Sequence, residues 1–111
     1  MKEIKAIIKP NMLDYVLEAL MEIPDLPGVT VSRTEGFGRQ RGMTTGPDPG
    51  EYATVEKVKI EIVVPDRLVE VVVGAIQRSA HTGRPGDGKI FIAEVLKSIR
   101  IRTGQVDDDA L

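Results

Sequence analysis

The sequence predicts a single α+β domain in which two strand–helix–strand units share one antiparallel sheet. An alternating apolar strand, a proline and an amphipathic segment occur at 4–21 and again at 58–76. Each unit continues into a further segment with strand character, so the order of elements is βαββαβ. This is the split-βαβ or ferredoxin-like sandwich, in which both helices cover one face of four antiparallel strands.

Length and composition limit the class of protein. The chain has 111 residues, of which 41% are hydrophobic and 29% charged, as is typical of one soluble globular domain. The net charge is −2 and the apolar runs are short, so we expect no nucleic-acid partner and no direct membrane insertion. With no cysteine and one histidine, thiolate chemistry and a two-histidine metal site are excluded. The start of the chain lacks a secretion signal, so we expect a cytoplasmic protein.

The first unit begins with a predicted strand from Ile4 to Lys9, which Pro10 ends. From Met12 onward, apolar residues recur every three or four positions, which predicts an amphipathic helix. Its expected apolar side consists of Leu13, Val16, Leu17, Leu20 and Met21. Residues 29–31 then open the second strand.

The second unit repeats this pattern after a strand at Val55–Val64, which Pro65 ends. A helix is predicted over 67–79, and Ile90–Val95 forms the fourth strand. The expected inward residues of the helix are Leu68, Val71, Val72, Ala75 and Ile76, with Leu68 and Val71 at the same distance from the proline as Leu13 and Val16. The apolar residues at 62–64 reach both faces of the sheet. Cover by other subunits and simple β-propensity explain this equally well.

Two glycine-rich segments are predicted to be loops. Residues 36–50 hold five glycines and two prolines without periodicity, which in a small domain indicates a functional loop. Residues 82–89 hold three glycines, whose backbone N–H groups could approach an anion closely. Lys89 supplies a point charge and Arg84 a guanidinium for phosphate oxygens. The spacing is not that of a P-loop, and a plain turn without ligand stays an alternative.

Arg100 and Arg102 alternate with Ile99 and Ile101, which predicts a short strand with both arginines on one face. Two guanidinium groups at this spacing could hold one polyphosphate. The alternative is a solvated edge strand whose charges prevent aggregation. No Ser/His/Asp arrangement and no catalytic pair of carboxylates can be argued from the sequence.

Five segments, taken in order, resemble the PII signal-transduction family over nearly the whole chain. They are Ile7–Pro10, Gly36–Gln40, Lys57–Pro65, Thr82–Phe91 and Arg100–Gly104. The resemblance implies one PII-like domain over 1–111, with a ferredoxin-like fold assembled into a compact homotrimer. It also implies a long regulatory loop, the T-loop, at about 37–56, a phosphate-binding loop at about 82–89 and a C-terminal loop at about 102–111.

The resemblance further implies ligands and the residues that hold them. ATP or ADP would bind competitively in clefts between subunits, with Mg²⁺ accompanying ATP and with 2-oxoglutarate as a further ligand. Gln40 and Lys57 match residues that hold Mg-ATP and 2-oxoglutarate. The positions that match nucleotide-binding residues are Thr30, Gly38 and Val63 for the base and ribose, and Arg39, Gly86, Asp87, Gly88, Lys89, Arg100 and Arg102 for the phosphates, the last two from across the cleft.

By this resemblance the chain is a regulator and not an enzyme. Its T-loop would dock on a transporter or enzyme in the regulation of nitrogen utilisation. The T-loop departs from the family pattern, because Gly46–Gly50 replaces a polar segment and the stretch from Tyr52 to Lys57 is two residues shorter. Tyr52 matches a tyrosine that is uridylylated in some relatives, and an unmodified loop anchor is an equal alternative.

Two other functions stay open at this point. The first is a PII-like regulator of a metal-efflux or bicarbonate-transport system that senses ATP, ADP or AMP without 2-oxoglutarate. The second, from another class, is a small nucleotide-hydrolysing enzyme, although no general base is evident beside the loop at 82–89.

Overall fold

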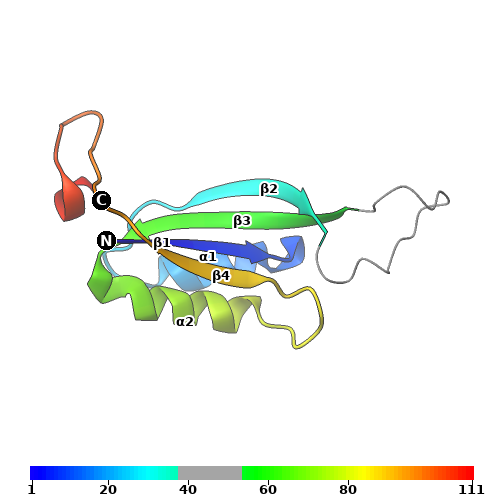
Figure 1. The fold of residues 1–111 in the computed structure, drawn as a ribbon. Helices are drawn as coiled ribbons and strands as arrows, with labels where there is room; N and C mark the ends of the chain where they lie inside the picture. Colours follow the sequence, from blue (N-terminus) through cyan, green and yellow to red (C-terminus); the bar gives the residue numbers. More distant parts are fainter. Residues whose placement is uncertain (38–53) are drawn as a thin grey trace.

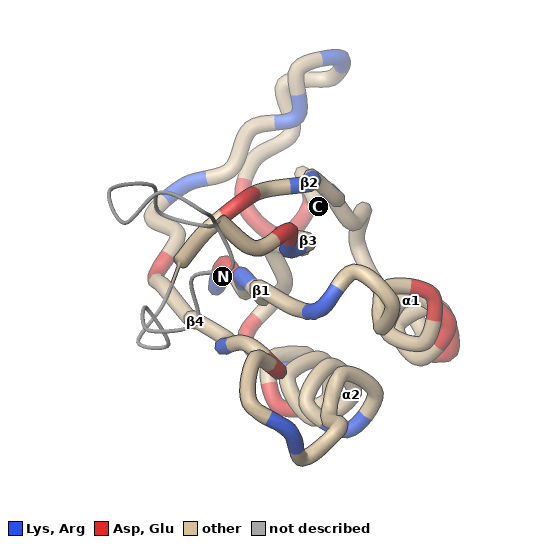
Figure 2. The backbone as a smooth tube through the Cα atoms, turned by 90° about the vertical axis from the view of Figure 1, so that its right-hand side faces the viewer, with Lys and Arg blue, Asp and Glu red and all other residues tan. Residues whose placement is uncertain are grey.

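The computed structural model describes residues 1–37 and 54–111, which form a four-stranded antiparallel sheet with two helices on one face (Figures 1 and 2). The elements are β1 (Lys2–Ile8), α1 (Leu13–Met21), β2 (Thr30–Gly36), β3 (Val55–Val64), α2 (Val69–Ala80) and β4 (Lys89–Glu94). The strand order is β2-β3-β1-β4, and all three pairings are antiparallel. The predicted βαββαβ ferredoxin-like fold is therefore confirmed.

The hydrophobic core lies between the sheet and the helices. The alternating residues of β1 and β3 pair directly, as in Ile4 with Ile62 and Ala6 with Ile60. Each fully buried aliphatic side chain of this kind stabilises the fold by roughly 1.5–3 kcal/mol. The buried residues are Ile4, Ala6, Ile8, Val16, Leu20, Val58, Ile60, Ile62, Val64, Leu68, Val72, Ala75, Ile76 and Ala80.

Both helices begin with a short 3-10 turn, and this corrects one predicted core position. The turns are Pro10–Met12 and Asp66–Leu68, so Pro10 lies inside its turn whereas Pro65 precedes its turn as the N-cap residue. The second helix is thereby displaced by one residue relative to the proline. Val72, not Val71, is the equivalent of Val16, and Val71 is 45% exposed. Met21 at the last turn of α1 is 84% exposed and does not belong to the core.

The segment after β4 differs from the sequence-based expectation. Residues 99–102 form no strand, because only one isolated bridge joins Ile99 to Val106, with a turn between them. Two backbone hydrogen bonds close this turn: Arg100 N–H donates to Gln105 O over 2.8 Å, and Gly104 N–H donates to Arg100 O over 2.8 Å. A 3-10 turn at Asp107–Ala110 follows. The C-terminal segment is therefore a small hairpin that protrudes from the domain (Figure 1).

The face of the sheet opposite the helices is not covered by either of them (Figure 2). Lys5, Ile7, Val63 and Phe91 lie on this outer face, since they alternate with the buried residues of their strands. Val63 and Ile7 are half-buried, and Phe91 is exposed. Among the helices in the described part of the chain, none has the length and apolar character needed to cross a bilayer.

Most of the predicted T-loop lies outside the described residues. The ladder between β2 and β3 extends to the pair Gly36 and Val55, so these two strands lead to that segment side by side. The predicted site residues Gly38, Arg39, Gln40 and Tyr52 lie within it, and their predictions stay untested by the fold.

Candidate functional site

The loop at 82–89 joins the end of α2 to the start of β4, and glycines give it a shape that other residues rarely adopt. Gly83, Gly86 and Gly88 have φ angles of +84°, +93° and +100°. At Gly88 a Cβ atom would lie 1.6 Å from the carbonyl oxygen of Ile7. The loop therefore rests directly on the backbone of β1, and only glycine allows this approach.

The carboxylate of Asp87 holds the two ends of this loop together. Its Oδ2 accepts hydrogen bonds from the N–H groups of Thr82 and Gly83, both over 2.9 Å. Its Oδ1 accepts a hydrogen bond from the Thr82 hydroxyl and lies 3.1 Å from Lys9 Nζ. The Thr82 hydroxyl and N–H, then the Gly83 N–H and Lys9, hold the pKa of the Asp87 carboxyl well below its ordinary value.

Two lysines from neighbouring strands fasten the loop to the sheet. Lys57 Nζ, near the start of β3, donates a hydrogen bond to Gly86 O over 2.6 Å. Lys9 follows β1 and donates to Thr82 Oγ1 over 3.1 Å, besides its ion pair with Asp87. The sequence analysis missed the contribution of Lys9. Alternation along the chain puts Lys9 on the same outward side as Lys5 and Ile7, but this pattern does not reveal its partners in the loop at 82–89.

The remaining groups of the loop are suited to an anion. In the described part of the chain, the N–H groups of Gly86 and Gly88 donate to no other residue, and Lys89 is exposed. A hollow of about 380 Å³ lies beside the loop. Its lining combines Asp87, Gly88 and Lys89 with apolar residues of β1 and α2. Backbone donors and a lysine next to a partly apolar hollow can bind a phosphate-bearing ligand.

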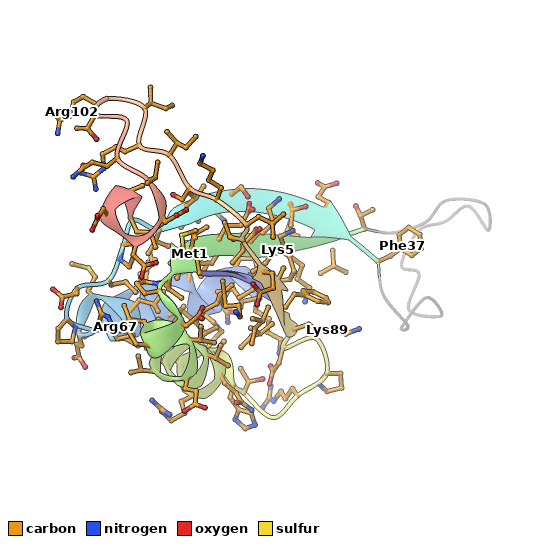
Figure 3. All side chains as sticks on the ribbon, turned by 60° about the vertical axis from the view of Figure 1, so that its left-hand side comes forward. Met1, Lys5, Phe37, Arg67, Lys89 and Arg102 are labelled. Atoms are coloured by element: carbon orange, nitrogen blue, oxygen red, sulfur yellow. The ribbon has the colours of Figure 1, made fainter. Side chains whose placement is uncertain are left out.

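The structure brings only some of the predicted residues together. Lys57, Gly86, Asp87, Gly88 and Lys89 gather at one end of the sheet, as the hydrogen bonds above require. Arg102 lies at the protruding tip of the C-terminal hairpin, at the other end of the molecule from Lys89 (Figure 3).

Arg100, Thr30 and Val63 also lie apart from the loop contacts. The guanidinium of Arg100 donates to Ala110 O over 3.4 Å and to Leu111 O over 3.0 Å. Thr30, the first residue of β2, and Val63 of β3 lie on the outer face of the sheet, where Thr30 pairs with Glu61. Arg102 therefore does not contact the loop of its own chain, and the hydrogen bonds given for Arg100 go to the end of the chain.

The fold and this loop define a class of small α+β protein in which a glycine-rich loop with free backbone donors lies at the end of an open sheet. The chain belongs to the family described as nitrogen regulatory protein P-II, whose model matches residues 1–105. It is 52% identical to a nitrogen regulatory protein P-II of Azospirillum brasilense and 53% identical to nitrogen regulatory protein P-II 1 of Escherichia coli K12. A P-II protein of Rhodospirillum rubrum is 53% identical. Each similarity covers 100% of this chain and 100% of the relative.

Proposed function

We propose that this chain forms a homotrimeric adenine-nucleotide sensor that regulates partner proteins in nitrogen utilisation. The observation that carries the proposal is the loop at 82–89, whose three positive-φ glycines and two lysine contacts present backbone donors and Lys89 at the end of the sheet. The family membership and the names of the relatives support the regulatory function.

The nucleotide binds between chains. The separation between the loop at 82–89 and Arg102 of the C-terminal hairpin supports this. A polyphosphate that contacts both the loop at 82–89 and Arg102 has to span the molecule, unless the two regions come from different chains. The outer face of the sheet, with half-buried Ile7 and Val63 and exposed Phe91, is the surface that neighbouring subunits cover. In such an assembly Thr30 and Val63 contact the base and ribose, while Arg100 and Arg102 of the next subunit meet the phosphates.

The long loop at about 37–56 delivers the signal. Lys57 lies two residues after Val55, which ends the β2–β3 ladder, and it also binds Gly86 O in the phosphate loop. A ligand that changes the surroundings of Lys57 thus acts on both loops at once. Arg39 and Gln40, at the other base of the long loop, add contacts to the γ-phosphate and Mg²⁺. The chain itself turns over no substrate and acts through the conformation of this loop on an enzyme or transporter.

Calorimetry and molecular mass together test the central proposal. The full-length chain should sediment as a trimer and bind ATP and ADP in competition. Lys89→Ala should weaken ATP roughly tenfold or more, because a charge-assisted contact to phosphate is lost. Lys97→Ala, which removes the same charge from an exposed position after β4, should leave ATP binding unchanged. A monomer that binds no adenine nucleotide would contradict the proposal.

Mixed oligomers test whether two chains share each site. One chain carries Lys89→Ala, and the other carries both Arg100→Ala and Arg102→Ala. When the two chains are unfolded and refolded together, every mixed trimer contains one cleft with an intact loop from one chain and intact arginines from the next. High-affinity ATP binding should therefore return in the mixture. If it does not return, although mixed trimers are isolated, the arginines do not act across the cleft.

A titration with 2-oxoglutarate separates nitrogen regulation from the alternative of a metal-efflux or bicarbonate-transport regulator. The full-length similarity to nitrogen regulatory proteins favours a response to this acid. Binding of 2-oxoglutarate should release heat only with Mg²⁺ and ATP present, and Lys57→Met should remove it. Absence of heat at every ATP concentration would support the alternative function.

A further inference from the structure

The side chain of Asp87 is fully engaged within its own loop. Both carboxylate oxygens are used, one by the N–H groups of Thr82 and Gly83 and the other by the Thr82 hydroxyl and Lys9. The Thr82 hydroxyl in turn accepts a hydrogen bond from the N–H of Arg84 over 3.2 Å. The Thr82 hydroxyl proton and the N–H groups of Thr82 and Gly83 are all used on the carboxylate, which could only repel a phosphate beside it.

The same contacts determine the shape of the loop. They join Thr82 and Gly83, at the start of the loop, to Asp87 near its end, and so close the turn that contains Gly86. Lys9 brings a positive charge from the end of β1 to the only carboxylate in the loop. The N–H groups of Gly86 and Gly88, on either side of Asp87 in the chain, are then held in a fixed position next to a neutralised group.

We propose that Thr82, Asp87 and Lys9 form a positioning network that sets the affinity for the phosphates of the nucleotide without touching it. This inference rests on the nucleotide site proposed above. It gives Asp87 a role different from direct ligand contact: its backbone faces the phosphates, while its side chain holds the loop. Lys9, which no motif identified as functional, neutralises the carboxylate and connects the loop to β1.

Matched substitutions test the network through ATP affinity. Asp87→Asn replaces one acceptor oxygen by an NH₂ group that cannot accept from Thr82 or Gly83, and it should weaken ATP about tenfold to a hundredfold. Asp25→Asn is the control, because Asp25 is exposed, lies far from the loop in sequence and has a φ of 60° that Asn also adopts. It should bind ATP like the unmodified chain.

The pattern among the Thr82 and Lys9 variants distinguishes positioning from direct contact. Thr82→Val should weaken ATP, whereas Thr82→Ser, which keeps the hydroxyl, should restore most of the affinity. Lys9→Met should weaken ATP less than Asp87→Asn. Thr82→Val should add little to Asp87→Asn in the double variant, because both act through one network.

Measurements with Mg²⁺ and with EDTA exclude the competing role of Asp87 as a ligand of Mg-ATP. Positioning predicts the same loss of affinity in both conditions, with thermal unfolding recorded to confirm that each variant is folded. If Asp87→Asn loses affinity only with Mg²⁺, or if Thr82→Val binds normally, the inference is wrong. If Asp87→Asn does not fold, the Thr82→Val and Thr82→Ser pair decides. Failure of the unmodified chain to bind ATP would instead contradict the proposed nucleotide site.

Discussion

The loop at 82–89 and the C-terminal hairpin at 99–106 are both predicted to meet the phosphates of a nucleotide, yet they are built differently. The loop is held from outside, by Lys9 and Lys57 of two neighbouring strands and by the backbone of β1. The hairpin is held from within, by two backbone hydrogen bonds and one isolated bridge. The loop is thus preorganised in a single chain, whereas in the proposed nucleotide site the arginines come from a neighbouring chain.

The largest effect on stability and ATP binding is expected at Gly88, where a single added Cβ atom would prevent the close approach of the loop to β1. In Gly88→Ala the new Cβ would lie 1.6 Å from Ile7 O, and the φ of +100° is strained for alanine. We expect a loss of about 3 kcal/mol or more in the free energy of unfolding and loss of measurable ATP binding. Urea unfolding and calorimetry measure the two effects.

Gly104→Ala in the hairpin is the matched control for this substitution. Gly104 also has a positive φ, +72°, but nothing lies within 4 Å of its added Cβ. Only the backbone strain applies, so the cost should be about 1–2 kcal/mol, with ATP binding retained. Equal costs at the two glycines would show that the contact with β1 adds nothing to the loop.

This contrast also shows what the sequence can reveal about the site. The glycines of the loop were recognisable because their number and spacing have few structural uses besides tight turns. The close contact of Gly88 with Ile7 O depends on the pairing of β1 with β4, which joins residues far apart in the chain. The role of Lys9 was missed for the same reason, since its partners Thr82 and Asp87 come from another part of the sequence.

More of the fold than of the candidate site could be predicted from the sequence. Alternation in β1 and β3 and the two amphipathic helices determine the layers, because each pattern has one apolar side. The error at Val71 arises at the start of α2, because Pro65 precedes its 3-10 turn whereas Pro10 lies inside its own, so the helix is displaced by one residue relative to the proline. Met21 is the last residue of α1 and is exposed there. Arg100 and Arg102 alternate like a strand, but no partner strand exists for them within the described residues.

The next largest effect is expected from removing both arginines of the hairpin. Arg100→Ala with Arg102→Ala should weaken ATP about a hundredfold and AMP less than about tenfold, because contacts to the terminal phosphates are lost. Competition binding with a fluorescent ATP analogue measures both ligands. A control with Arg67→Ala and Arg78→Ala removes the same charge beside α2. Equal losses for ATP and AMP would place the arginines away from the terminal phosphates.

Substitution of the two arginines one at a time should lower the free energy of unfolding by different amounts. Arg100 donates to Ala110 O and Leu111 O, whereas Arg102 is exposed at the tip of the hairpin. Arg100→Ala should therefore lower the free energy of unfolding by about 1 kcal/mol and Arg102→Ala by less than about 0.5 kcal/mol. Thermal unfolding without nucleotide measures this difference. A larger loss for Arg102→Ala would show that the tip has contacts beyond those of one chain.

The smallest expected effect is the change in the free energy of unfolding with pH near neutrality. This pH dependence tests the loop at 82–89, because it depends on the carboxyl of Asp87. Hydrogen bonds from Thr82, then from Gly83 and Lys9, keep the pKa of this carboxyl below its ordinary value of about 4. A lowered folded-state pKa stabilises the fold above that ordinary value, and the contribution is lost as the pH falls below it. The difference in free energy of unfolding between the unmodified chain and Asp87→Asn should be constant from about pH 6 to 8 and should shrink below about pH 4. Asp66, whose pKa is lowered by the N-terminal amine and Lys2, acts in both proteins and cancels in this difference. A difference that stays constant into acid would mean that the carboxylate of Asp87 is not ionised in the network.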